Sequence, residues 1–512
     1  MDRPSLGRVV AASVAASALA LTGISAPASA APSSAKASPT KLAKKLVKDV
    51  NAADAQRHLI AFQRIADRNG RTRASNTPGY DASVEYVVST MTNAGFDVTT
   101  PEFTYDEEIT DAATIEIGAD SYEMRKVTLS PQTPVGGVTG PLRVVPEDAS
   151  TGCEAADFAG QNFAGSVALI RRGGCTFQIK EQTAAAAGAI AVIVSNNSPD
   201  EAFTPILAEP GTVPVGFTTQ ANGTALAARA GETTTFDLRF HTETRVQRNV
   251  IAQTKTGKKD NVVMAGAHLD SVPEGPGIND NGSGAAGLLQ IAQKLGGSPK
   301  VNNAVRFAWW GSEELGLLGS TAYVESLSFD EQLDIALYLN FDMIASPNAA
   351  YFVYDGDDSD GVGAGPGPYG SAQIEQTFTN FLTDRRGIPT EGTDFSGRSD
   401  YGPFIAVGIP AGGLFTGAEG IKTAEQADKW GGTAGVAYDP CYHQACDNLG
   451  NVNRAAFNQN LDAAAWSVGI YGWSTSDVNG VPNRALRAKN RALGQLKLTK
   501  TAVHPALKVT AK

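Results

Sequence analysis

The stretch Val262–Gly284, VVMAGAHLDSVPEGPGINDNGSG, constrains the fold of this chain more than any other. Its first residues, Val262–Ala267, are apolar and predict a buried strand, and His268 and Asp270 follow at the carboxyl end of that strand. Open α/β sheets bind their ligands at this edge. A polar, glycine-rich loop comes next, and the apolar spacing of Ala285–Leu295 predicts a helix. The stretch therefore predicts an α/β sheet with polar side chains gathered where a strand ends.

Asp280 lies just ahead of the predicted helix, across the loop from His268. An imidazole and a carboxylate held on two rigid elements suit a divalent metal such as zinc, which takes nitrogen and oxygen ligands. Each residue also has an ordinary explanation, because an Asp before a helix is typically an N-cap and a His after a strand is typically a surface residue. The metal interpretation therefore depends on further ligands elsewhere in the chain.

Two more strand ends carry acids. Val305–Trp310 reads as a strand, and Glu313 and Glu314 follow its carboxyl end. Two adjacent acids point in different directions, so one can bind a cation while the other stays free as a base. Ile335–Phe341 is strand-like and is followed by Asp342. An acid bordered by apolar residues is costly to bury unless it is paired or bound to metal, which favours a functional role for it.

The chain has only five histidines. His58 lies in a predicted helix and His504 in a basic tail, each without an acidic cluster, and His241 lies in a strand-like segment and is interpreted as structural. His268 and His443 are therefore the candidate metal ligands.

The composition limits the possible partners. With 512 residues, 42% hydrophobic and 19% charged, the chain is long enough for more than one domain. A formal net charge of −11 and a pI near 5.1 argue against nucleic acid or an anionic membrane surface as the partner. Residues 1–30 have a basic start, an apolar run and a small-residue cleavage site, which predict a signal peptide. We expect a secreted, extracellular protein with no membrane span, and a flexible leader over residues 31–40.

The pattern of segments predicts a domain made of two pieces. Residues 41–95 have helical spacing, and Asn76–Gly79 breaks them into two helices. Strand-like segments follow over residues 97–104 and 113–117. Between about residues 127 and 236 short β-like runs alternate with Gly and Pro, and the first pattern then resumes. We therefore expect a smaller domain inserted into a larger one.

The four cysteines allow three disulfide connectivities. Cys153 and Cys175 both lie in the inserted block and would be oxidised in an exported protein. Cys441 and Cys446 are close in sequence, and a disulfide between them would form a tight loop that fixes the direction of His443.

Taken in order, these residues resemble the secreted co-catalytic di-zinc aminopeptidases, the bacterial leucine-type aminopeptidase family. The resemblance covers roughly residues 41–125 and 236–474 and implies the zinc aminopeptidase/phosphorylase-like α/β fold, three layers with a mixed, mostly parallel sheet flanked by helices. Phe163–Phe177 resembles the signature of a protease-associated (PA) domain. Residues 126–235 would then form an inserted, β-rich α+β domain that acts as a lid or spacer.

The resemblance also implies a site. One zinc would be bound by His268 and Asp342 and the other by Glu314 and His443, with Asp280 bridging the two and followed by a cis peptide bond. The remaining roles fall on four residues: Glu313 as general base, Tyr442 as the group that stabilises the oxyanion, Arg398 as a residue that helps hold the substrate end, and Phe415 as part of the pocket for the first side chain.

The implied function is a monomeric enzyme with two zinc ions per chain that hydrolyses the N-terminal bond of peptides and proteins, preferring apolar first residues such as Leu. Calcium binding, which some relatives show, stays open. The alternatives are the same site used as a carboxypeptidase or as a glutaminyl cyclase with one zinc, and a non-catalytic protein whose inserted domain recruits a partner. The basic residues 475–512 are either a loosely docked tail or a removable propeptide.

Overall fold

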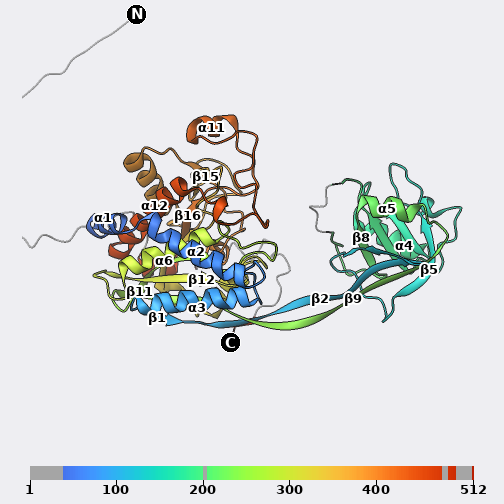
Figure 1. Ribbon diagram of the computed structural model, residues 1–512, viewed down its shortest axis with the longest axis horizontal. Coiled ribbons are helices and arrows are strands. Elements are labelled where there is room, and N and C mark those ends of the chain that lie inside the picture. Colours follow the sequence, from blue (N-terminus) through green and yellow to red (C-terminus); the bar gives the residue numbers. More distant parts are fainter. Residues whose placement is uncertain (1–38, 200–204, 476–482, 490, 492–509, 512) are drawn as a thin grey trace, which may run out of the picture.

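The computed structural model describes residues 39–199, 205–475, 483–489, 491 and 510–511, which form two bodies joined by a long two-stranded ribbon (Figure 1). The predicted signal peptide, residues 1–30, lies outside the described residues, as does nearly all of the leader. The larger body holds an eight-stranded sheet. Its strands, from one edge to the other, are β1 (Asp97–Thr99), β10 (Val250–Gln253), β12 (Asn303–Trp310), β11 (Lys258–His268), β13 (Ile335–Phe341), β16 (Ala411–Phe415), β14 (Phe352–Tyr354) and β15 (Glu391–Thr393).

The centre of this sheet is parallel. β12, β11, β13 and β16 run in the same direction, so their carboxyl ends meet at one edge. Successive side chains of β11 face opposite sides: Val263 and Ala265 pack into the main core, whereas Met264 packs into a second core on the other face. The sheet is therefore the middle layer of three, as predicted.

Helices cover both faces of the sheet. The main core is built by α1 (Pro39–Asp49), α2 (Ala52–Arg68), α3 (Pro78–Asn93), α6 (Gly282–Leu295), α9 (Ser371–Asn380) and α12 (Arg454–Trp473). The second core is covered by α7 (Leu318–Ser326) and α10 (Tyr401–Ala406). α8 (Phe329–Asp334) leads into β13, and α11 (Ala424–Trp430) lies at the periphery (Figure 1). Short helical turns span Ala155–Phe158, Phe381–Arg385 and Leu449–Asn451.

The N-terminal region differs from the prediction of two helices, because it forms three. The predicted break is present, and the Thr77 side chain caps α3 at that point. A second break separates α1 from α2. Asn51 causes it, since its side-chain oxygen accepts a hydrogen bond from the backbone N–H of Asp54 at 2.8 Å and so starts a new helix.

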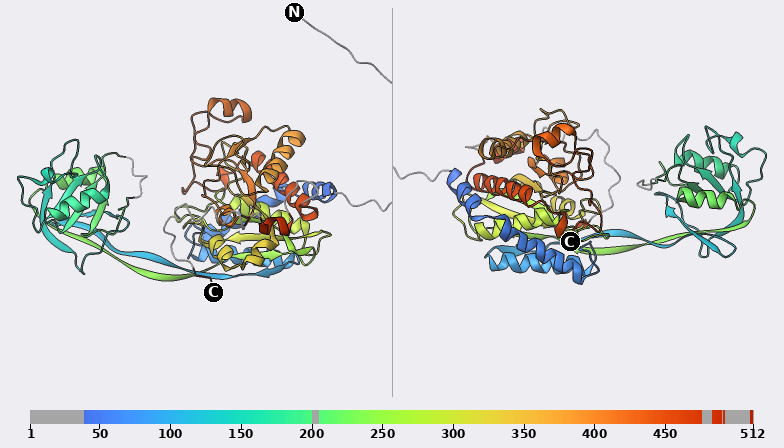
Figure 2. Two further views of the ribbon diagram at one scale, coloured as in Figure 1. Left: turned by 180° about the vertical axis from the view of Figure 1, so that it is seen from behind. Right: turned by 45° about the horizontal axis from the view of Figure 1, so that its top comes forward.

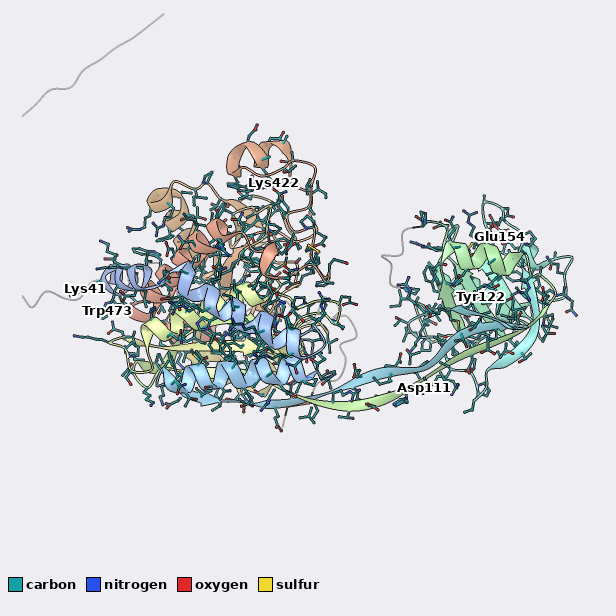
Figure 3. The ribbon with its side chains drawn as sticks, viewed as in Figure 1. Lys41, Asp111, Tyr122, Glu154, Lys422 and Trp473 are labelled. Carbon is teal, nitrogen blue, oxygen red and sulfur yellow. A yellow bond between two sulfur atoms is a disulfide. The ribbon has the colours of Figure 1, made fainter. Side chains whose placement is uncertain are left out.

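The ribbon consists of β2 (Glu102–Ile117) and β9 (Thr233–Arg248), which pair antiparallel along nearly their whole length. β2 is one continuous strand, so the residues between the two predicted strand-like segments are extended as well. Asp111, labelled on the ribbon in Figure 3, accepts from His241 at 2.8 Å, which agrees with a structural role for this histidine. The other views also show the two bodies well separated (Figure 2).

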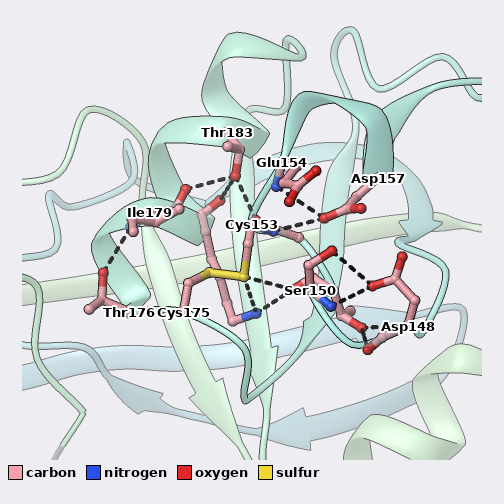
Figure 4. The surroundings of a disulfide bond; sticks show 12 residues. Asp148, Ser150, Cys153, Glu154, Asp157, Cys175, Thr176, Ile179 and Thr183 are labelled. Atoms are coloured by element: carbon pink, nitrogen blue, oxygen red, sulfur yellow. Dashed lines mark hydrogen bonds between the residues drawn. A yellow bond between two sulfur atoms is a disulfide. The ribbon is translucent and has the colours of Figure 1, made fainter.

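The smaller body continues the sheet of the ribbon. The strands β5 (Val138–Val144), β6 (Val167–Arg171), β7 (Ala191–Ser195) and β8 (Val215–Thr218) are parallel, and α4 (Phe177–Ala186) and α5 (Gln220–Ala227) pack on them. β3 (Asp120–Glu123) and β4 (Arg125–Lys126) complete this sheet in the smaller body, whereas β17 (Thr510–Ala511) pairs with β2 at the other end of the ribbon. The disulfide Cys153–Cys175 ties the loop before β6 to the start of α4 (Figure 4).

Within the part of the chain that the structure describes, no helix is long and apolar enough to cross a membrane. Most of the predicted basic tail lies outside this part. Arg484, one of the tail residues inside it, forms ion pairs with Asp330 at 3.0 Å and with Asp334 at 2.9 Å.

Candidate metal centre

Five side chains converge where the parallel strands end. His268 is the last residue of β11, Glu314 follows β12, and Asp342 follows β13 directly. Asp280 lies ahead of α6, and His443 comes from the loop closed by the disulfide Cys441–Cys446. The chain folds this way because each strand is apolar and buried up to its last residues, so the first polar side chains emerge together at one edge.

Asp280 lies between the two imidazoles. Its Oδ1 is 3.2 Å from Nε2 of His268, and its Oδ2 is 3.3 Å from Nε2 of His443. One carboxylate therefore presents a separate oxygen to each half of the site, which is the arrangement expected of a ligand shared by two cations.

The first half of the site holds His268 and Asp342. Oδ1 of Asp342 is 3.4 Å from Nε2 of His268. The hydroxyl of Ser399 donates to the other oxygen, Oδ2, at 2.5 Å, and the Asn340 side chain donates to Ser399 at 2.8 Å. Ser399 thus fixes one carboxylate oxygen of Asp342, and the other oxygen is left for the pocket.

The second half holds Glu314 and His443. Oε2 of Glu314 is 3.0 Å from Nε2 of His443. His443 has a positive φ of 55°, and its ring stacks on the ring of Tyr442 at a centroid distance of 3.8 Å. The short loop between Cys441 and Cys446, whose cysteines are bonded as expected, fixes this direction.

The donor set fits a divalent metal. Oε1 of Glu314 and Oδ1 of Asp342 are buried and have no hydrogen-bond partner among the described residues, although buried carboxylate oxygens are normally satisfied. Two imidazoles with carboxylates are ligands that zinc prefers. A cation here would satisfy the orphaned oxygens and offset the excess of acids over imidazoles.

The charges of the pocket are strongly coupled. Burial raises the pKa of Glu314 to about 7, and the charge of Asp280 adds to this effect. Burial lowers the pKa of His443, but its hydrogen bonds to Asp280 and Glu314 outweigh burial and raise it to about 10. For His268 the acids Glu313 and Asp342 likewise outweigh burial, and its pKa lies well above the usual value. A metal must displace these protons from the imidazoles.

Glu313 lines the same pocket, and one of its carboxylate oxygens lies within 4.8 Å of ligand atoms of His268 and Asp342. Its Oε2 is 3.9 Å from Nε2 of His268, and its side chain is nearly buried. Burial raises the pKa of Glu313 well above the usual value, although the nearby His268 opposes the shift. A basic carboxylate beside the metal ligands is suited to take up a proton.

Asp280 is itself held by a residue that sequence reasoning missed. The Asp447 carboxylate accepts the backbone N–H groups of Asn279 at 2.8 Å and of Asp280 at 2.9 Å. The Asp280–Asn281 bond is cis, as the resemblance implies, and Asn281 rather than Asp280 caps α6 through a hydrogen bond from Gly284. Asp280 is therefore not occupied as an N-cap.

Replacing Asp447 by Ala is expected to lower zinc affinity by about 10- to 100-fold, because residues that orient metal ligands typically contribute that much. Zinc titration of the metal-free protein against a competing chelator measures the effect. Asp428→Ala, which removes an acid from the peripheral helix α11, is the matched control. An affinity equal to that of the control would show that Asp447 does not orient Asp280.

Two further supports lie under the site. Asp270 accepts the backbone N–H groups of both Glu313 and Glu314, each at 3.2 Å. The fully buried Arg73 donates to the carbonyls of Pro276 at 2.8 Å and of Gly277 at 2.6 Å. Together they fix the two loops that carry the acids. The sequence alone does not predict this role of Arg73, because its partners are backbone carbonyls.

All nine site candidates line one pocket of about 90 Å³. Beside the metal-centre residues, its lining includes Met343, Tyr354 and Phe415, which give it an apolar side. At the rim, a guanidinium N–H of Arg398 donates to the hydroxyl oxygen of Tyr442 at 3.2 Å. The pocket thus joins a polar centre to space for an apolar side chain.

The remaining described histidines and acids form no comparable centre. His58 bonds to Tyr86 at 2.6 Å and to Gln293 at 3.0 Å. The acids Asp355, Asp357 and Glu375 lie within 4.8 Å of one another, but nearby backbone N–H groups already donate to each of them. This cluster could hold a cation, so the question of calcium binding stays open.

Comparisons with known proteins show which family the chain belongs to. The model of peptidase family M28 matches residues 249–468, and the PA domain model matches residues 138–226. The chain is 50% identical over 438 residues to a probable lipoprotein aminopeptidase of Mycobacterium tuberculosis, covering 85% of this chain and 87% of that protein. It is 45% identical over 477 residues to an aminopeptidase of Pseudomonas aeruginosa, covering 88% and 86%.

Solved structures are similar as well. The aminopeptidase from Aneurinibacillus sp. strain AM-1 has a TM-score of 0.57 at 27% identity, covering 84% of this chain and 95% of that one. A zinc aminopeptidase from Bacillus subtilis has a TM-score of 0.61 at 26% identity, covering 82% and 94%. The chain therefore belongs to the aminopeptidases of peptidase family M28 and carries an inserted PA domain.

Proposed function

We propose that this aminopeptidase is secreted, binds two zinc ions per chain and removes apolar first residues such as Leu from peptides and proteins. The observation that carries the proposal is the position of Asp280, whose two oxygens lie 3.2 Å and 3.3 Å from two different imidazoles. His268 and Asp342 would hold one zinc, and Glu314 and His443 the other. Zinc bound there supplies a Lewis acid that lowers the pKa of water towards neutrality.

Glu313 is proposed as the general base. It is buried, its pKa is raised, and it lies beside the metal ligands without completing either half of the site. It would take the proton of the attacking water and pass it to the leaving amine. The backbone hydrogen bond to Asp270 fixes the start of its side chain for both steps.

Tyr442 is proposed to stabilise the oxyanion. Arg398 donates to the Tyr442 hydroxyl oxygen, so the hydroxyl proton is free to point at the substrate. Burial raises the pKa of Tyr442 above its ordinary value, which keeps the proton in place at neutral pH. A preorganised donor of this kind stabilises charge that develops in the transition state.

The same pocket explains cleavage after the first residue. Acids gathered at its polar end, including Glu313 and Asp342, attract a free α-amino group. Phe415, Met343 and Tyr354 form the apolar side, which would receive the first side chain.

Export is supported by the cysteines. All four are paired in two disulfides, which form in oxidising compartments. The proposal is a released protein, although one relative is described as a lipoprotein. We propose a monomer in which residues 41–125 and 236–474 form the peptidase domain and residues 126–235 the PA domain.

A substrate panel tests the proposed function. Leu p-nitroanilide should be hydrolysed faster than the Asp and Lys anilides, and N-acetyl-Leu p-nitroanilide should not be hydrolysed at all. A chelator should abolish the activity, and added zinc should restore it. Equal hydrolysis of an N-acetylated peptide would point to a carboxypeptidase instead, and cyclisation of N-terminal Gln would point to a glutaminyl cyclase.

A further inference from the structure

The rim of the pocket carries an ion pair that the roles above do not use. The guanidinium of Arg398 donates to the Glu419 carboxylate at 2.8 Å through one nitrogen and to the Tyr442 hydroxyl at 3.2 Å through another. Both charged side chains are more than half exposed. Glu419 therefore binds the same guanidinium that is expected to hold the far end of a substrate.

Glu419 also lines a groove that shares a residue with the metal pocket. The groove has a volume of about 530 Å³ and is lined by Glu419, Tyr442, Gln444 and Cys446, among others. Tyr442 lines both the pocket and the groove, so one side chain borders both spaces. A peptide with its first residue in the pocket would pass Tyr442 and continue along Glu419.

The length of the substrate then decides which charge meets this ion pair. Each further residue of an extended chain adds about 3.3–3.6 Å. In a dipeptide, the free carboxylate comes directly after the second residue, close to the cut, and faces both Arg398 and Glu419. In a longer peptide a neutral amide stands at that point, and the carboxylate lies farther out in solvent. Like charges repel, so the Glu419 carboxylate disfavours only the dipeptide.

We propose that Glu419 is a specificity-determining residue, which occupies Arg398 and repels a carboxylate next to the cut, so that the enzyme prefers peptides longer than two residues. This inference rests on the proposed function. The carboxylate of Glu419 needs no contact with the reacting atoms for this effect.

The test compares Leu-Gly with Leu-Gly amide, which differ in the carboxylate alone. In Glu419→Gln the side chain keeps its size and can still accept from Arg398 but loses its charge. The ratio of kcat/KM for acid over amide should rise about fivefold, the size expected for one exposed charge interaction. The rise should shrink in 1 M salt, where charges are screened beyond about 3 Å.

Two control variants make the result specific. Glu147→Gln removes the acid of a comparable exposed Arg–Glu pair, with Arg171, in the smaller body, and it should leave the ratio unchanged. In the double variant Glu419→Gln, Arg398→Gln the ratio should return to near the wild-type value, because the repulsion by the carboxylate and the attraction by the guanidinium are lost together. A gain that persists in the double variant would overturn the assignment.

An unchanged ratio in Glu419→Gln would also overturn it. If the wild type still hydrolyses Leu-Gly amide in a zinc-dependent way, that result removes only this inference and leaves the proposed function standing. A wild type that hydrolyses neither substrate removes both.

Discussion

Replacing Glu313 by Gln is expected to lower kcat by about 10³-fold, the middle of the range for loss of a general base. Gln has the same size but cannot take up a proton from water. The zinc content should stay at the wild-type level, because the other five side chains are proposed to hold both ions without Glu313. Steady-state kinetics on Leu p-nitroanilide and metal analysis of the same sample measure both quantities.

Glu325→Gln, an exposed acid on the neighbouring helix α7, is the control for this variant and should behave as the wild type. Substantial activity in Glu313→Gln would refute its role as the base. Loss of zinc together with activity would instead make Glu313 a ligand, and the proton transfer would need another group.

Replacing Asp280 by Ala is expected to have the other large effect, because Asp280 alone presents one oxygen to each half of the site. The zinc content should fall to well below one ion per chain, and activity should drop by at least about 10³-fold, since a metal-activated nucleophile is lost. Metal analysis and kinetics check this, and circular dichroism shows whether the variant is folded.

Asp342→Ala is the comparison variant for this prediction. Of the two imidazoles, only that of His268 lies within 4.0 Å of Asp342, so this variant should lose one zinc and keep about one. Equal metal loss in the two variants would show that Asp280 is not shared between the halves.

The sequence predicted much of the site because several of the candidate metal ligands lie at strand ends. The second part of β11, from Val262 on, is apolar and buried, and β12 and β13 are almost fully buried, so their patterns are easy to recognise. In a parallel sheet the ends of such strands meet, which brings His268, Glu314 and Asp342 together without any knowledge of the loops. His443 came from the resemblance and from the cysteines around it.

The supports of the site could not be predicted in the same way. Arg73 contacts backbone carbonyls, and Asp447 contacts backbone N–H groups. No pattern of side chains in the sequence predicts such contacts. Their partners are also far away in sequence. The second break in the N-terminal helices depended on one side chain, Asn51, whose cap competes with a continuous helical pattern.

The long ribbon was missed for a different reason. Between residues 105 and 112 the chain is rich in acids, which weakens a strand prediction from apolar alternation. In the structure these acids lie on an exposed ribbon and pair across it, as Glu107 does with Arg245 and Asp106 with Thr244. Partners on the other strand, more than a hundred residues later, make the segment extended.

Zinc counting on the secreted wild-type chain tests the central claim most directly. Metal analysis should give about two zinc ions per chain, and anomalous diffraction at the zinc edge should place both between His268, Asp280 and His443. A single zinc, or two zinc ions bound elsewhere, would contradict the proposal that Asp280 is shared by two zinc ions.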